Sequence, residues 1–439
     1  MLEILKNRLI SNKEKIFLIT PCGEYTFHDL LLQIEKWHGI LRAVQSGSIV
    51  VHSGGFDLNN ISLLIALAEK NCIAVPVSSS DLSISEIIEI TKANYYIDSI
   101  LPVESSVTCI NSTISPLLSG PGIIFFTSGS SGKPKAALHD FNLLMMKYNK
   151  AHKAYRTCSV LLFDHLAGFD NLFYVLFAGG CLIIPAEFNP NQVLKVIAEH
   201  RVQVLSLTPS FLNFMLLQQA ELKMGLQNLE IIVFSSEKMP ETTLERLKNI
   251  IPENIRLIQK YGSTEMGSPS SRTKPDNPLW LKFDPDQVGY QIIDSVLYLK
   301  TSSSFQGYLN YKNQNNINEW YCTGDMVETD GEWLHILGRE SDQINVGGRK
   351  VLPQEVEEVL MGMENVIDVT VMGKDHPLTG NVVKAEIVLN TDEDKRSFTN
   401  RMRQFCRDKL AAYKIPVYLE FKKQLEPEKR MKKMRGKNG

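Results

Sequence analysis

Short apolar runs alternate with amphipathic stretches over the first two thirds of the chain. Residues 49–53 and 72–77 have the continuous hydrophobicity of buried strands, and residues 57–70 between them carry apolar side chains at helical spacing. The same rhythm recurs over residues 123–127, 141–153, 181–185, 190–200 and 203–207. Strands that alternate with helices in this way predict an α/β fold with mostly parallel sheets covered by helices.

The pattern changes in the last third of the chain. Residues 297–326 consist of short β-like runs with glycine turns. After Gly338 and Arg339 come a glutamate-rich helical stretch, two strand-like stretches and a charged helix, at residues 352–363, 367–374, 382–389 and 393–412. We therefore expect a large N-terminal domain at residues 1–339 and a small α+β domain at residues 340–439.

The first twenty residues read as an amphipathic helix that leads into a strand, and not as a signal peptide. A transmembrane helix needs about 18 or more consecutive apolar residues, and the sequence contains no such stretch. We expect no membrane span.

Composition excludes several classes of protein. Of the 439 residues, 44% are hydrophobic and 22% are charged, and the net charge is −2, so bulk charge gives no reason to expect a nucleic-acid partner or an anionic membrane. The seven cysteines are widely spaced and include no CxxC pair. This usage is typical of reduced thiols in the cytoplasm and argues against a disulfide framework or a zinc site.

A loop rich in hydroxyl groups and glycine follows the apolar run that ends at Phe126. Hydroxyl groups and bare backbone N–H groups can surround phosphate oxygens, and lysine adds positive charge. A Walker loop is excluded because only two residues separate Gly129 from Gly132, and Pro134 follows Lys133. A flexible surface loop is the alternative. The candidate nucleotide-binding residues of this loop are Thr127, Ser128, Gly129, Ser130, Ser131, Gly132, Lys133 and Lys135.

The order of this loop resembles the phosphate-binding signature of the adenylate-forming superfamily, which includes acyl- and aryl-CoA ligases, peptide-synthetase adenylation domains and firefly luciferase. Further motifs of that family follow in the same order and extend the resemblance over nearly the whole chain. They are Tyr261-Gly262-Ser263-Thr264-Glu265, Tyr321-Cys322-Thr323-Gly324-Asp325, Gly338-Arg339-Glu340-Ser341-Asp342-Gln343-Ile344 and Gly347-Gly348-Arg349-Lys350-Val351.

The resemblance implies roles in nucleotide binding. Tyr261, with Gly262 beside it, would stack on adenine, and Thr264 would donate a hydrogen bond to the α-phosphate. Glu265 is an oxygen ligand suited to Mg²⁺. Asp325 would accept both ribose hydroxyl groups, and Arg339 would add a second ribose or phosphate contact.

The reaction also needs a lysine between two anions, because a carboxylate must attack an α-phosphate. The family carries this lysine near the C-terminus, six residues after a proline, which points here to Lys433. The surrounding sequence departs from the family pattern, so Lys432 and Lys429 are rival candidates. A solvated basic tail is the other interpretation.

The acyl pocket allows two interpretations. His165 and Gly168 match a segment of acyl-CoA ligases, whereas Asp164 matches the ammonium-binding aspartate of amino-acid-activating relatives. The joint match of the first pair favours an uncharged acyl or aryl acid, although His165 could equally be a structural histidine. Gly267 is a further substrate-binding candidate, and residues 208–211 and 235–237 are expected to form other walls.

The resemblance therefore implies an AMP-forming ligase that uses ATP and Mg²⁺ to convert a carboxylic acid, with fatty acids among the candidates, into acyl-AMP. The small domain then rotates at a hinge at Ser341, and residues 347–348 let the thiol of CoA or of a carrier-protein phosphopantetheine approach. The alternatives are a stand-alone adenylation enzyme that loads an acyl or amino acid onto a carrier protein, and an inactive homologue that binds nucleotide or acid.

Overall fold

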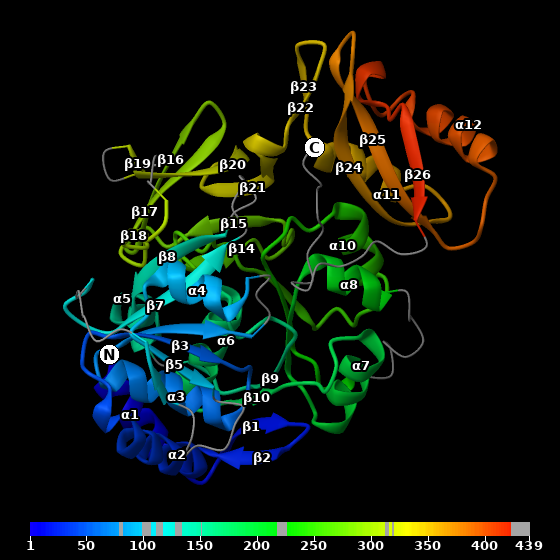
Figure 1. The fold of residues 1–439 in the computed structure, drawn as a ribbon. Helices are drawn as coiled ribbons and strands as arrows, with labels where there is room; N and C mark the ends of the chain where they lie inside the picture. The colour runs from blue at the N-terminus through cyan, green and yellow to red at the C-terminus, as the bar shows by residue number, and fades with distance from the viewer. Residues whose placement is uncertain are drawn as a thin grey trace.

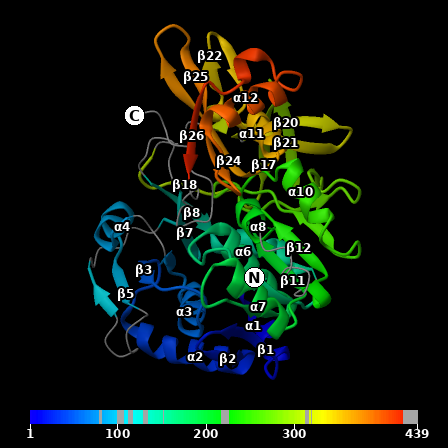
Figure 2. The same cartoon turned by 90° about the vertical axis from the view of Figure 1, so that its right-hand side faces the viewer.

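A computed structural model describes residues 1–78, 82–98, 107–110, 117–127, 134–150, 152–216, 226–311, 316–317 and 320–422. Within them, three sheets form the N-terminal part of the molecule, and a fourth sheet forms a separate C-terminal part that lies over helices α8 and α10 in both views (Figures 1 and 2). No helix in these ranges combines the length and the hydrophobicity needed to cross a membrane.

The first sheet confirms the predicted parallel arrangement, since all but its last strand pair are parallel. In spatial order its strands are β13 (Arg256–Gln259), β12 (Ile231–Phe234), β11 (Val204–Leu207), β9 (Arg156–Ser159), β10 (Cys181–Ile183), β1 (Ile16–Thr20) and β2 (Gly23–Thr26). Helices α7 (Pro190–Glu199), α8 (Pro209–Leu216) and α10 (Glu241–Lys248) pack on it through apolar side chains at helical spacing, such as Val193 and Ile197. The antiparallel strand β2 lies at the edge.

The second sheet has a parallel centre and antiparallel edges. In spatial order its strands are β18 (Gly307–Tyr308), β8 (Lys135–Asp140), β7 (Gly122–Thr127), β4 (Ile73–Val77), β3 (Ile49–Ser53), β5 (Tyr95–Asp98) and β6 (Val107–Cys109). Helices α3 (Leu58–Glu69) and α6 (Leu166–Ala178) contribute to one apolar cluster that also contains Leu18 and Leu182 of the first sheet and Phe125 of the second. This shared core fixes the two sheets relative to each other.

Helices α1 (Leu2–Ser11), α2 (Phe27–Ile40) and α4 (Ile84–Thr91) also belong to the N-terminal part. The predicted helix followed by a strand at the N-terminus is therefore confirmed. Helix α2 starts where Thr26 and Asp29 form a reciprocal capping box, which satisfies backbone N–H groups of the first turn.

The predicted helix over residues 141–153 is too long. Helix α5 ends at Met145 and continues only as a 3₁₀ turn over Met146–Asn149. Lys147 and Tyr148 of this turn both contact the buried side chain of Asp170, and a continuing α-helix would direct them elsewhere. The hydrophobic pattern is the same for both conformations, so the sequence predicted the longer element.

The third sheet is antiparallel throughout and confirms the β-rich texture near residues 297–326. Its strands are β14 (Ser271–Thr273), β15 (Trp280–Phe283), β21 (Trp333–Arg339), β20 (Trp320–Asp330), β17 (Val296–Thr301) and β16 (Val288–Ile293), with β19 (Asn316–Ile317) paired to β20. Strand β21 ends at Arg339, and a short 3₁₀ turn over Glu340–Asp342 leads into the fourth sheet.

The fourth sheet consists of β23 (Arg349–Val351), β22 (Ile344–Val346), β25 (Gly380–Leu389), β24 (Val366–His376) and β26 (Tyr418–Lys422), covered by α11 (Pro353–Met361) and α12 (Lys395–Cys406). The predicted charged helix over residues 393–412 is wrong at its end. It stops at Cys406 because the chain turns, buries Leu410 and returns to place β26 beside β25.

Candidate active site

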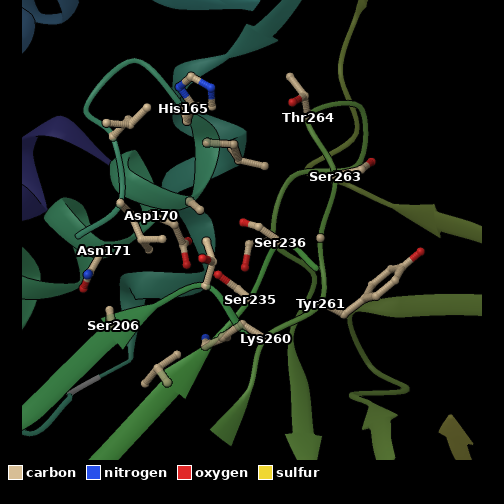
Figure 3. Close-up of a pocket in the computed structure, with 18 of the residues that line it drawn as sticks. His165, Asp170, Asn171, Ser206, Ser235, Ser236, Lys260, Tyr261, Ser263 and Thr264 are labelled. Carbon is tan, nitrogen blue, oxygen red and sulfur yellow. The ribbon is translucent and has the colours of Figure 1, made fainter. Parts of the chain in front are cut away.

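A cavity of about 680 Å³ opens where parallel strands of the first sheet end. The residues that follow β12 and β13, including Ser235, Ser236 and Lys260, line it together with side chains of α6 and of the third sheet. Figure 3 shows His165 and Thr264 at one end of this cavity and Asp170, Asn171 and Lys260 toward the other. The carboxyl edge of a parallel sheet is the usual ligand site of α/β folds.

Thr127 and Lys135 flank the Ser/Gly-rich loop. They are directly paired across the β7–β8 hairpin, and both line the cavity. The Lys135 ammonium nitrogen lies 3.9 Å from the centre of the Tyr311 ring and 5.2 Å from that of Tyr308. Cation–π contacts of this kind hold the charge of Lys135 at the mouth of the hairpin. Residues 128–133 lie outside the described ranges.

Tyr308 fixes one oxygen of Glu265. Its hydroxyl group donates to Glu265 Oε1, and Tyr308 itself is placed by the pairing of β18 with β8. Burial and the adjacent carboxylate raise the pKa of Tyr308 well above its ordinary value, so the phenol remains a hydrogen-bond donor. Both residues line the cavity.

His139 holds the backbone at Thr264. The imidazole is fully buried, and its Nε2 lies 2.6 Å from the Thr264 carbonyl oxygen. Burial lowers the pKa of His139 to about 4, so the ring is neutral at pH 7 and donates its one N–H to that carbonyl. The Thr264 segment is thereby anchored to β8.

A hydrogen-bonded triad closes the side formed by the third sheet, with Tyr261 and Asp325 buried and the Arg339 side chain exposed. The Tyr261 hydroxyl donates to Asp325 Oδ2 at 2.6 Å, and Arg339 Nε donates to Asp325 Oδ1 at 3.2 Å. Burial raises the pKa of the Asp325 carboxyl, and the positive charge of Arg339 opposes that shift. The Tyr261 ring packs edge-on against Phe283, with 5.8 Å between centroids.

Asp164 orients His165 from behind the wall of the cavity. Asp164 Oδ1 lies 2.9 Å from His165 Nδ1, and Oδ2 accepts the backbone N–H of Ser78 at 2.9 Å. Although burial opposes ionisation, these hydrogen bonds and the charge of the imidazole keep the pKa of Asp164 well below its ordinary value. The opposite nitrogen, His165 Nε2, is buried without a partner among the described residues, and the ring lines the cavity.

Two family models match the chain. The model described as "AMP-binding enzyme" matches residues 119–301, and the one described as "AMP-binding enzyme C-terminal domain" matches residues 355–433. Together they cover more than half of the sequence, and the C-terminal model follows the larger one along the chain. This chain belongs to the adenylate-forming superfamily.

Curated relatives that match this chain are named as CoA ligases. A 2-succinylbenzoate–CoA ligase of Bacillus licheniformis is 26% identical over 338 residues, which is 72% of this chain and 69% of the relative. A 2-succinylbenzoate–CoA ligase of Listeria innocua is 24% identical over 446 aligned residues, covering 94% and 93% of the two chains. The crystal structure of the anthranilate CoA ligase AuaEII with anthranoyl-AMP superposes with a TM-score of 0.82 at 20% identity, over 97% and 93% of the chains.

This member of the superfamily is therefore an AMP-forming ligase, whose chemistry is ATP-dependent formation of an acyl-AMP followed by transfer of the acyl group to a thiol. Nine of the residues singled out in the sequence line the cavity. They are Thr127, Lys135, His165, Tyr261, Gly262, Thr264, Glu265, Arg339 and Ser341.

Four other candidates lie behind the wall and are absent from the described lining: Asp164, Gly168, Gly267 and Asp325. A β-carbon on Gly168 would lie 2.0 Å from the Leu162 carbonyl oxygen, so this glycine allows α6 to start against the preceding loop. Gly267 has φ +72, a backbone conformation that favours glycine. Asp164 and Asp325 position His165, Tyr261 and Arg339.

The C-terminal candidates are not near the cavity or not described. Lys429, Lys432 and Lys433 lie outside the described residues. Gly347 and Gly348 form the exposed turn between β22 and β23, which Figure 1 shows pointing away from the N-terminal part. In this orientation of the domains the turn does not line the cavity.

Sequence reasoning missed His139 and Tyr308. His139 is a single histidine within an apolar strand, and Tyr308 follows a serine-rich turn, so neither belongs to a pattern with recognisable spacing. Each contacts its partner across more than forty residues of sequence. Only the β18–β8–β7 pairing brings them to the Thr264–Glu265 segment.

Proposed function

We propose that this chain is an acid–CoA ligase whose carboxylic acid lies along the inner part of the cavity, with its reacting carboxylate near Thr264 and His165. The observation that carries the proposal is the continuity of one cavity from Lys135, Glu265 and Arg339 to the inner wall. That wall contains Val204, Ile231 and Ile258 on neighbouring strands, and the ring of Tyr174. A mainly apolar slot that ends at phosphate-binding groups suits an acyl or aryl acid.

In the first step, a carboxylate oxygen attacks the α-phosphorus of ATP, the bond to the β-phosphate breaks, and pyrophosphate leaves. Thr264 is supported from behind by His139 and offers its hydroxyl group to the α-phosphate. Lys135 supplies positive charge on the side of the phosphates. Charge-stabilising groups that are already in place lower the barrier most, because they need no reorganisation in the transition state.

The chemistry of Glu265 fits Mg²⁺. Its carboxylate lines the cavity, and Tyr308 holds only one of its oxygens in the described structure. No cluster of three His, Cys, Asp or Glu side chains occurs among the described residues, a finding compatible with a metal held by one carboxylate and the phosphates of ATP. When bound, Mg²⁺ would neutralise phosphate charge.

We place the domain boundary at residues 339–340 and the hinge at Ser341. Ser341 lies in the 3₁₀ turn after β21, and it lines the cavity. In the second step the thiol sulfur attacks the acyl carbon and AMP leaves. For this step the turn at residues 347–348 must reach the cavity, so the C-terminal domain must rotate from the orientation in Figure 1. Lys433 is the proposed lysine of the first step.

CoA is the acceptor that we favour, because curated relatives that match this chain are named as CoA ligases. A carrier protein is the alternative acceptor. A reaction that consumes ATP and CoA is typical of the cytoplasm. An amino acid is disfavoured as substrate, because both oxygens of Asp164 already accept hydrogen bonds and the side chain does not line the cavity.

Pyrophosphate exchange with fatty, aryl, dicarboxylic and amino acids tests the proposal. We expect ATP–pyrophosphate exchange with at least one acid and, once CoA is added, a stoichiometric acyl-CoA. Transfer only to a carrier protein would replace CoA as acceptor. Nucleotide binding without exchange for any acid would indicate an inactive homologue and contradict the proposed activity.

A further inference from the structure

A part-buried charge cluster that the proposed adenylation step does not use lies at the wall of the cavity. Asp170 of α6 contacts the ammonium group of Lys147 and the hydroxyl group of Tyr148, and Lys147 also donates to the Ser268 carbonyl oxygen at 3.1 Å. Burial lowers the pKa of Lys147, and the charge of Asp170 opposes that shift. Asp170 is thus neutralised by a dedicated partner.

Lys260 is a second cation at the same place. It follows β13 and lines the cavity, and its ammonium group has no hydrogen bond or ion pair with any described residue. Its charge acts on Lys147 and on Asp170, so the two lysines and the one carboxylate leave a single positive charge in excess. Figure 3 shows Lys260, Asp170 and Asn171 grouped away from His165 and Thr264.

Unpaired polar groups line the same cavity. Asn171 Nδ2, Thr157 Oγ1 and Ser271 Oγ are buried atoms with no hydrogen-bond partner among the described residues, and all three residues line the cavity. Leaving a buried polar atom unpaired is unfavourable, so a cavity that keeps several of them is suited to completion by a ligand. The missing ligand is an acceptor, and the excess charge indicates an anion.

We infer that the acid substrate carries a second anionic group, which binds Lys260 and Asn171 at the inner end of the cavity. This inference rests on the proposed function. It assigns the substrate class as a dicarboxylic acid whose linker spans the cavity from Thr264 and His165 to Lys260 and Asn171. This inference replaces the expectation of an uncharged acyl or aryl acid with an acid that carries a charged far end.

Two matched pairs of acids test the assignment. 2-Succinylbenzoate differs from 4-oxo-4-phenylbutanoate, and hexanedioate from hexanoate, by the second carboxylate. In pyrophosphate exchange, kcat/KM should be roughly tenfold to a hundredfold higher for the dicarboxylate in at least one pair, as expected for a hydrogen bond between charged groups. Lys260→Ala should remove this preference, so that the two acids of each pair give similar kcat/KM values.

The control is Lys153→Ala, because Lys153 pairs with Glu230 on the surface and is not part of the cavity. It should keep the wild-type preference. Lys260→Glu should reject dicarboxylates altogether. Equal kcat/KM within both pairs in the wild type, or a preference that survives Lys260→Ala, would overturn the inference and indicate that water completes the site.

Calorimetry separates this inference from the proposed function. If 2-succinylbenzoate or hexanedioate binds the wild type more tightly than its monocarboxylate partner, and Lys260→Ala abolishes the difference, the anion site stands even without turnover. If exchange favours monocarboxylates, the proposed ligase function stands and the proposed anion site is wrong. Absence of binding by both dicarboxylates would also remove it.

Discussion

The carboxylate of Glu358 in the C-terminal domain accepts the backbone N–H of Thr242 in the N-terminal domain at 2.8 Å. Its second oxygen accepts the N–H of Glu241 at 2.9 Å, so one acidic side chain caps the first turn of α10. Arg246 of the same helix donates to the Met361 carbonyl oxygen at 2.9 Å. These polar contacts hold the two domains in this orientation, and water would replace them in the proposed rotation of the small domain.

Glu358→Ala should therefore shift the domain equilibrium away from this orientation. Two hydrogen bonds to a carboxylate contribute about 1–3 kcal/mol, so the population ratio should change roughly tenfold or more. The measurement is the distance between one label in each domain by single-molecule energy transfer. Glu355→Ala is the matched control, since Glu355 lies on the same helix but pairs with Lys414 inside its own domain. Identical distance distributions for both variants would contradict the role of Glu358.

Glu265→Gln should slow acyl-AMP formation strongly, because the proposed Mg²⁺ loses its anionic ligand. Tyr308→Phe removes only the hydrogen bond that orients Glu265, so it should slow exchange less, by roughly tenfold, and raise the Mg²⁺ concentration needed for half-maximal rate. Pyrophosphate exchange across a magnesium titration measures both effects. If Glu265→Gln keeps a near-normal rate, Glu265 is not the metal ligand.

Acid should destabilise the fold through two buried histidines. Burial lowers the pKa of both His52 and His139 to about 4, from the ordinary value of 6.5. Below pH 6.5 these two histidines bind protons in the unfolded chain but remain neutral in the folded chain. The unfolding free energy therefore falls as the pH drops toward 4. Two such groups give a slope of about 2.7 kcal/mol per pH unit.

Urea unfolding between pH 6.5 and 5 measures this slope. His139→Gln should roughly halve it, because glutamine can still donate to the Thr264 carbonyl but does not titrate in this range. An unchanged slope in that variant would show that His139 is protonated in the folded state.

Lys433→Ala should greatly reduce adenylation but leave thioester formation from supplied acyl-AMP nearly intact. The lysine is needed only while two anions approach each other, and the loss of one preorganised charge there costs roughly a hundredfold in rate. Lys432→Ala and Lys429→Ala are the controls, since they lie on the same basic stretch. If a control variant slows adenylation as much as Lys433→Ala, Lys433 is not established as the adenylation lysine. If none of the three variants slows it, the C-terminal stretch is only a solvated basic tail.

Site residues that belong to short sequence motifs could be predicted. Site residues that meet only through the pairing of strands distant in the sequence could not. Thr264, Glu265 and Arg339 belong to short motifs, and all three line the cavity. Asp164 is an ammonium-binding candidate in one of the two interpretations of the acyl pocket, but both of its oxygens accept hydrogen bonds and its side chain does not line the cavity. Lys260 lies directly before the motif that starts at Tyr261. The sequence alone does not predict it as a site residue, because only the folded position of β13 brings it near α6. Hydrophobic periodicity predicts which elements form, and long-range pairing decides which polar groups meet.

The pairing of Arg339 with Asp325 has a consequence for energy coupling. Both residues lie beside the proposed ribose site, and Ser341 follows Arg339 by two positions, so the strand that carries a nucleotide contact is also the strand that enters the hinge. If AMP favours one setting of the hinge, thermodynamic reciprocity requires that setting to favour AMP by the same factor. Cross-linking the domains in either orientation should then change AMP affinity without altering a single nucleotide contact. The rate of AMP release would then depend on the movement of the hinge.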